Sequence, residues 1–207
     1  MVSIMDFRSS VVIIGCFGLI YTGCSPPIQT LEIYNNGRPK LVHEYKVISS
    51  SLGTDSITVK LIKYYRNGMK HYQQEIMNNQ PNGKYYSWHP NGVKFAKGKY
   101  LNGELSDKWA WWGKDGLPDS IRTFRKEMLH GEYIDYFSNG KPHKLMEYVE
   151  NKKYGYYKEL DEKGKKVSVG EYRNDIPHGH WIWWQNRIKT RELTYENGLK
   201  NGPFRIY

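Results

Sequence analysis

The stretch Gly83-Lys-Tyr-Tyr-Ser-Trp-His-Pro-Asn-Gly-Val-Lys-Phe-Ala-Lys-Gly-Lys-Tyr100 decides the fold of this chain. In it, Asn91-Gly92 lies between two short runs in which apolar and polar residues alternate. Asn-Gly in this setting is the strongest short-range signal of a β-hairpin, because both residues tolerate positive φ. We therefore expect strands over residues 84–89 and 93–101, a two-residue turn at Asn91-Gly92, and a loop over residues 102–107 into the next hairpin.

The same pattern recurs every 24 residues. One column of turn glycines comprises Gly68, Gly92, Gly116, Gly140 and Gly164. A second comprises Gly83, Gly131, Gly155 and Gly179, with Asp107 in the missing slot and Gly202 one residue early. A lone hairpin is marginal in water, so neighbouring units must stack. The sequence predicts an all-β fold: an antiparallel meander of about six 24-residue hairpin repeats that forms an extended twisted sheet over residues 31–207, with about seven extra residues within residues 47–55.

These units resemble a known repeat family. The pattern Gly-x-Trp/Tyr-x-x-Trp/Tyr-x-x-Asn-Gly, followed by Tyr eight residues on, is similar to the bacterial variant of the MORN repeat, over residues 31–207. Proteins with this variant often carry the label of YwqK-type antitoxin component. The resemblance implies a membrane-associated or scaffolding β-meander, and the label implies a protein toxin as a partner.

Aromatic residues fill further columns of the repeat. The position two residues after the second glycine column is aromatic in every copy, namely Tyr85, Trp109, Tyr133, Tyr157, Trp181 and Phe204. The position five residues after it is large and apolar, namely Trp88, Trp112, Tyr136, Leu160, Trp184 and Tyr207. A position that carries the same kind of residue in every unit meets a requirement that all units share, which is packing against the next hairpin. We therefore interpret both columns as packing positions. The expected register places Tyr85 opposite Gly98, where its ring would cover the glycine.

A fourth column behaves differently. It contains Ser87, Trp111, Asp135, Glu159, Trp183 and Ile206. Alternate residues of a strand share one face, so Trp111 is expected on the face of Trp109, with the two carboxylates between Trp111 and Trp183. Tryptophans beside carboxylates suit a sugar or a cationic ligand. The candidate ligand face is therefore Trp111, Trp183, Asp135 and Glu159, and the alternative is local burial of the two indoles.

The N-terminal segment has the form of an export signal. Arg8 precedes about ten apolar residues that are followed by small residues, which is typical of a secretory signal. The ending Thr22-Gly23-Cys24 resembles a bacterial lipobox, although Tyr21 stands where Leu is usual. This resemblance implies a signal peptide over residues 1–23 and a lipid such as palmitate on Cys24, followed by a tether over residues 24–30. Simple cleavage and an uncleaved anchor are the alternatives.

Composition narrows the class of protein. A mean hydropathy of −0.75 excludes a membrane-embedded body, and 15% aromatic residues argue against disorder. The net charge of +10 favours anionic partners. Cys16 and Cys24 are the only cysteines, so a mature chain that begins at Cys24 has neither a disulfide nor a cysteine metal site.

We find no signature of an enzyme. The chain has no Gly-x-Ser-x-Gly, phosphate loop or His-Glu-x-x-His, so we expect no catalytic residue, cofactor or metal. We hypothesise a lipid-anchored, non-enzymatic β-repeat binding or scaffold protein of the bacterial cell envelope, facing the periplasm. Its partners would be the membrane, through acylated Cys24, and a protein or an anionic glycan; no nucleic acid is expected. The alternatives are an antitoxin that neutralises a protein toxin, and a carbohydrate-binding module.

Overall fold

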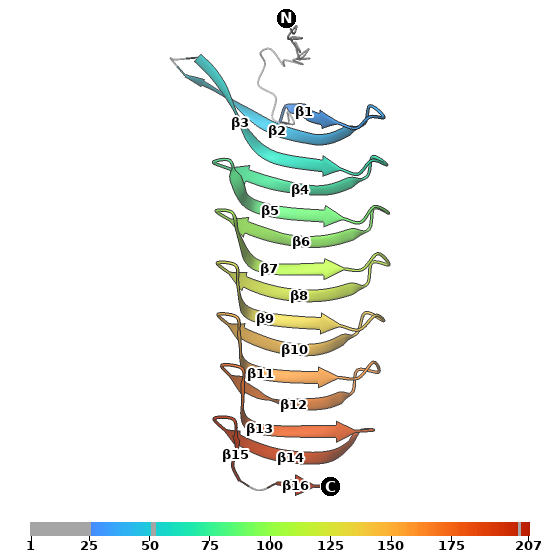
Figure 1. Cartoon of the computed structure of the whole chain (residues 1–207), viewed down its shortest axis with the longest axis vertical. Coiled ribbons are helices and arrows are strands. Elements are labelled where there is room, and N and C mark those ends of the chain that lie inside the picture. Colours follow the sequence, from blue (N-terminus) through green and yellow to red (C-terminus); the bar gives the residue numbers. More distant parts are fainter. Residues whose placement is uncertain (1–25, 51–52, 203) are drawn as a thin grey trace, which may run out of the picture.

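The computed structural model describes residues 26–50, 53–202 and 204–207, and over these ranges the fold is all-β. Sixteen strands in the described residues form one antiparallel sheet, which follows chain order from β1 to β15, while β16 pairs with β14. The two edges lie at opposite ends of a tall, open column (Figure 1). The predicted all-β antiparallel meander is thereby confirmed. The predicted signal peptide and Cys24 lie outside the described residues. The predicted tether over residues 24–30 extends too far, because the first strand already begins at Ile28 and pairs with its neighbour there.

The strands pair as seven stacked hairpins, β1–β2 to β13–β14, within the described part of the chain. Their bounds are β1 (Ile28–Ile33), β2 (Pro39–Ser50), β3 (Gly53–Tyr64), β4 (Lys70–Met77), β5 (Gln80–Trp88), β6 (Lys94–Leu101), β7 (Glu104–Trp112), β8 (Pro118–Arg125), β9 (Met128–Tyr136), β10 (Pro142–Val149), β11 (Lys152–Leu160), β12 (Lys166–Arg173), β13 (Ile176–Gln185), β14 (Ile188–Glu196), β15 (Leu199–Lys200) and β16 (Arg205–Ile206). The extra residues lengthen β2 and β3, whose shared end projects beyond the other hairpins in Figure 1.

The hairpins from β1–β2 to β11–β12 close with a long turn and two-residue turns join most of the hairpins, which is the opposite of the predicted arrangement. The hairpin β13–β14 closes instead with the two-residue turn Asn186-Arg187, where both φ values are positive. At Asn91-Gly92 the connection is longer than two residues, because the His89 N–H donates to the Val93 carbonyl (2.7 Å) and the Gly92 N–H donates to the His89 carbonyl (2.8 Å). Only Gly92 of that pair has positive φ. The two-residue turn is Asn102-Gly103, where both φ values are positive, so the predicted loop over residues 102–107 is wrong and β7 begins at Glu104.

The turn asparagines are explained by a ladder of hydrogen bonds between successive long turns. The side-chain oxygen of Asn91 accepts from the backbone N–H of Val93 (3.2 Å) within its own turn. The Asn91 amide then donates to the Lys114 carbonyl of the next turn (2.9 Å). Asn36, Asn67 and Asn139 make the same two contacts. The asparagine side chain carries both an acceptor and a donor, so it can accept within its own turn and donate to the next one. Aspartate can only accept.

The second glycine column marks a bulge inside the strands. Gly83 has φ of +109°, and a Cβ on it would collide with the Glu75 side chain, whose carboxylate accepts from the Lys84 N–H (2.8 Å). Asp107 fills the same slot with φ of +60°, which aspartate tolerates better than most residues. Its carboxylate forms an ion pair with Lys99 (3.2 Å). Bulges bend the strand that carries them, and the hairpins curve accordingly.

Aromatic side chains pack along one face of the sheet. Trp109 and Trp181 are 3% and 5% exposed. The Trp109 ring centre lies 5.4 Å from that of Tyr85 and 5.1 Å from that of Tyr100. These close aromatic pairs support the interpretation of the first column as core from Tyr85 to Trp181, whereas it is wrong for Phe204, which is 53% exposed at the end of the sheet.

The glycine next to this core is covered by a different ring from the one predicted. Tyr85 does lie opposite Gly98 in the register, as expected. However, the Trp109 indole occupies the space beside the glycine, where a Cβ would clash with its ring atoms. The covering residue therefore comes from the next strand, because the bulge shifts β7 relative to β6 between Lys97 and Lys99.

The third tryptophan of the Trp109–Trp112 cluster belongs to the other side of the sheet. Side chains alternate along β7, which directs Trp112 away from Trp109 and Trp111. There the Lys94 ammonium lies 5.4 Å from the centre of its ring. The column that contains Trp112 is half-buried in β5, β7, β9 and β13, so it packs less tightly than the Trp109 column.

Candidate functional site

The four candidate residues lie in one row across the sheet. Each strand of this row places its residue directly opposite the next, in the order Trp111, Ser120, Asp135, Lys144, Glu159, Ser168 and Trp183. Neighbouring strands are about 4.8 Å apart. The two tryptophans, six strands apart, are thus separated by about 29 Å, and the two carboxylates, two strands apart, by about 10 Å. The tryptophans therefore belong to two separate sites.

At the C-terminal end of the row, Glu159 and Trp183 come together. They line a hollow of about 290 Å³ together with Tyr157, Ser168, Tyr172, Pro177, Trp181 and Tyr195. The Glu159 carboxylate accepts hydrogen bonds from the Ser168 hydroxyl (3.0 Å) and the Tyr157 hydroxyl (3.2 Å). Burial, and then the charge of Glu159, raise the pKa of Tyr157, which keeps this hydroxyl a donor. The carboxylate is thus occupied by neighbours from its own sheet.

The Trp183 indole is held between two neighbours. It stacks on Trp181 with ring centres 5.7 Å apart, and the Arg191 guanidinium lies 3.9 Å from its ring centre. A guanidinium at this distance is a close cation–π contact. Local burial therefore accounts for Trp183 better than an open platform does.

The N-terminal end of the row is more open. Trp111 stacks on Trp109 with ring centres 5.7 Å apart, and the Arg122 guanidinium lies 5.2 Å from the Trp111 ring centre. A hollow of about 400 Å³ beside them is lined by His89, Phe95, Trp111, Trp112, Gly113, Lys114, Asp119, Ser120 and Arg122. This volume falls within the range of small-molecule sites. Asp135 is not among the residues that line either hollow.

This hollow lies beside a long turn that lacks a pair of rings. Three other long turns pack an aromatic pair beside them, namely Tyr65–His71 (4.4 Å), His89–Phe95 (4.9 Å) and Phe137–His143 (4.2 Å between ring centres). The corresponding positions of the turn that begins at Gly113 are Gly113 and Asp119, and the turn that begins at Asp161 also lacks the pair, with Asp161 and Val167. Sequence reasoning missed Gly113 and Asp119, and alignment of these two columns at the 24-residue period is the signal that reveals them.

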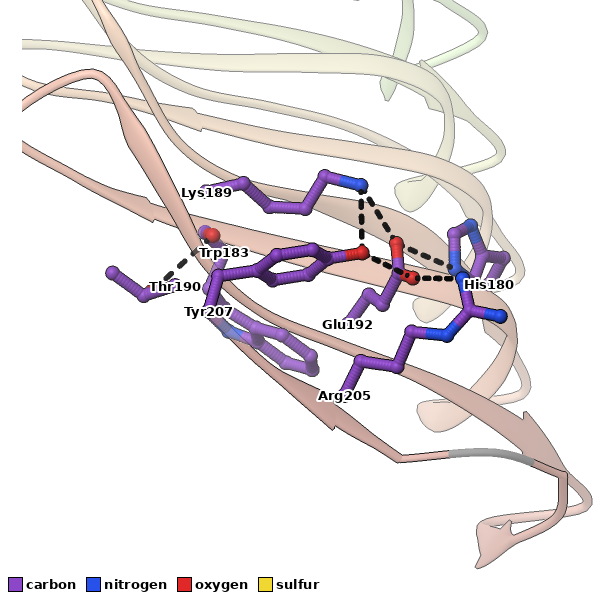
Figure 2. Close-up of polar contacts among 7 residues, drawn as sticks. All are labelled: His180, Trp183, Lys189, Thr190, Glu192, Arg205 and Tyr207. Atoms are coloured by element: carbon purple, nitrogen blue, oxygen red, sulfur yellow. Dashed lines mark hydrogen bonds and ion pairs between the residues drawn. The ribbon is translucent and has the colours of Figure 1, made fainter.

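One carboxylate with a strongly lowered pKa, that of Glu192, belongs to a structural cluster. Glu192 is 8% exposed, and Figure 2 shows it surrounded by His180, Lys189, Arg205 and Tyr207. Its carboxylate accepts from the Tyr207 hydroxyl (2.6 Å) and the Lys189 ammonium (2.8 Å), which with Arg205 hold the pKa of Glu192 at about 2. Because Arg205 belongs to β16 and Tyr207 follows it directly, the cluster holds this short strand on the edge of β14, which would otherwise be open.

The described residues contain neither a metal-binding cluster nor a membrane-spanning helix. No group of three or more His, Cys, Asp or Glu side chains in residues 26–50, 53–202 and 204–207 is placed to hold a metal ion. The same residues contain no helix long and apolar enough to cross a membrane.

Comparisons with known proteins add little to this description. No protein-family model matches the chain, and no curated protein matches it at a significant level. Among solved structures, a porin-like protein from Bacteroides uniformis ATCC 8492 is similar over 83% of this chain and 85% of that chain, with 10% identity and a TM-score of 0.21. A likeness at this TM-score indicates neither a shared fold nor a shared function.

Proposed function

We propose that this protein is a lipid-anchored, non-enzymatic binding scaffold of the bacterial cell envelope. The observation that carries the proposal is the continuous open sheet, which displays one row of side chains over about 29 Å between two separate hollows. A row of this length suits an extended partner better than a single small molecule. The strand alternation keeps the whole row on one face, so a partner that lies along it meets both hollows.

The attachment to the membrane is proposed from the sequence. Thr22-Gly23-Cys24 resembles a lipobox, and β1 begins only four residues after Cys24. Four extended residues span at most about 14 Å. A lipid on Cys24 would therefore hold the first hairpin close to the membrane and direct the column away from it. Multiple acyl chains would make this attachment stable, since each buried methylene contributes about 0.8 kcal/mol.

Fractionation of the native host tests the anchor. The wild-type protein should stay with membranes after a carbonate wash, and Cys24→Ser should leave them. Cys16→Ser is the matched control and should fractionate like the wild type, because residue 16 is removed with the proposed signal peptide. Retention of Cys24→Ser in the washed membranes would refute the lipid anchor.

Crosslinking with mass spectrometry in the native host tests the binding role. Crosslinks from the row-bearing face to one envelope component support the scaffold. Neutralisation of a coexpressed toxin by this protein would instead favour the antitoxin alternative, and the same crosslinks would then identify the toxin.

A further inference from the structure

We infer that the hollow at Gly113 and Asp119 binds an acidic sugar residue of a glycan chain. This inference rests on the proposed scaffold function, because it names the partner of the same face. The site is the hollow of about 400 Å³ described above, and it is distinct from the hollow at Trp183.

The wall of the hollow is aromatic. His89, Phe95 and Trp111 line it. The Trp112 indole lies on the other side of the sheet, and the carbonyl oxygen of Trp112 is 2.9 Å from the His89 Nε2 at this hollow. A sugar ring presents flat C–H surfaces that pack on aromatic rings, and tryptophan combines a large apolar surface with a polar edge. The space lies beside positions 113 and 119, where three other long turns carry an aromatic pair.

The polar groups of the hollow distinguish a sugar from an apolar ring. Asp119 supplies a carboxylate acceptor and holds the Ser120 hydroxyl at 3.1 Å. Arg122 supplies guanidinium donors, and within the described residues its buried Nε has no hydrogen-bond partner. A phenyl ring would leave the Arg122 Nε without a partner, which is costly for a buried polar atom. A ring with several hydroxyl groups both donates to the carboxylate and accepts from the guanidinium.

The charges in the hollow favour an acidic sugar. Lys114 and Arg122 are cations, whereas Asp119 is the single carboxylate among the lining residues. A sugar carboxylate beside the two cations would form charge-assisted hydrogen bonds, which are about twice as strong as neutral ones. The chain as a whole, with a net charge of +10, would also attract an anionic polymer.

The hollow at Trp183 does not offer the same chemistry. Its carboxylate, Glu159, already accepts two hydroxyl hydrogen bonds and faces His143 at 3.6 Å and Lys144 at 3.9 Å. Its cation, Arg191, lies 3.9 Å from the Trp183 ring centre, whereas Arg122 lies farther from the rings of Trp111 (5.2 Å) and Tyr133 (5.3 Å). Its binding groups are therefore paired with each other.

The test is a glycan array that carries uronic-acid, sialylated and neutral oligosaccharides, probed with the purified Cys24→Ser chain. We expect binding to acidic glycans and none to their neutral counterparts. Because this chain has no anchor, the array tests the sugar site independently of the lipid. If the array shows no binding while fractionation confirms the anchor, the sugar site alone is refuted. If fractionation refutes the anchor, binding on the array should be unaffected.

The decisive variant fills the hollow. Gly113→Phe with Asp119→His copies the Phe137–His143 pair, which the same fold accommodates. The Cβ at position 113 would press only on the Asp115 carboxylate, the far end of a flexible side chain. We expect an unchanged melting temperature and at least about a tenfold loss of glycan affinity, equivalent to 1.4 kcal/mol or more. The matched control, Phe137→His with His143→Phe, alters a neighbouring pair outside the hollow and should bind normally.

Lys114→Gln tests the charge. It should weaken binding of the acidic glycan several-fold and flatten its dependence on salt. Binding that survives the filling variant would overturn the site. Binding of neutral glycans alone would refute an acidic sugar as the ligand. If no glycan binds, and a protein partner crosslinks to the wild type but not to the variant with the filled hollow, the ligand is a peptide and not a sugar.

Discussion

Replacing Gly98 by methionine and Trp109 by tyrosine together should leave the sheet nearly as stable as the wild type, although each change alone should destabilise it. The reason is a pairing rule within the repeats. Where the strand carries Gly98 or Gly170, the next strand carries tryptophan, whose indole fills the space beside the glycine. Where the strand carries Met146, the next strand carries Tyr157 directly opposite. The double variant converts the first arrangement into the second.

The expected magnitudes follow from the contacts. A side chain at Gly98 would clash with the Trp109 ring atoms, and Gly98 has no left-handed φ to add backbone strain. The indole would be displaced with its hydrogen bond to the Lys99 carbonyl (3.1 Å), so Gly98→Met should cost about 3 kcal/mol. Trp109→Tyr should cost about 2 kcal/mol through the gap that it leaves. The double variant should cost no more than about 1 kcal/mol, against a sum of about 5 kcal/mol for the single changes, which is a coupling of about 4–5 kcal/mol and lies above the usual range for contacting residues.

Urea unfolding followed by circular dichroism measures these differences without relying on tryptophan fluorescence. Gly98→Met with Trp181→Tyr is the matched control, because β6 and β13 are not neighbours in the sheet, so the two positions do not touch and their costs should add within about 0.5 kcal/mol. Additive costs in the first pair would refute the pairing rule, as would equal coupling in the control.

Trp109→Ala should cost about 3–5 kcal/mol because that indole is 3% exposed, whereas Trp111→Ala should cost less; thermal unfolding in the reverse order would contradict the division between core and row. Asp115→Asn should stabilise the chain by about 0.5–1.5 kcal/mol in the same assay, because it restores the missing amide donor of the turn ladder, and no gain would argue against the ladder. The pKa of Glu192 lies below its ordinary value, so its stabilising contribution is complete above about pH 4.5 and is lost as the pH falls through about 2. NMR titration should show β16 detaching in that window, and at a higher pH in Lys189→Met; an unshifted titration in that variant would count against the cluster.

The sequence by itself determined the repeat and the face of each side chain. Glycines at a fixed spacing set the unit, and the alternation of strand residues set which side chains share a face. Hence the all-β meander, the pairing of Tyr85 with Gly98 and the common row of Trp111 and Asp135 follow from local rules.

Only the tertiary structure decided what depends on contacts between hairpins. Asn-Gly is compatible with both kinds of turn, and the asparagine is needed at the long turn because its amide reaches the turn of the next hairpin. The ring that covers Gly98 comes from β7, since a bulge shifts the register there. The hollow at Gly113 likewise arises from an absent side chain, whose effect depends on what the neighbouring repeats place around it. The spacing of residues along the chain does not predict these contacts, because they form only when neighbouring repeats stack.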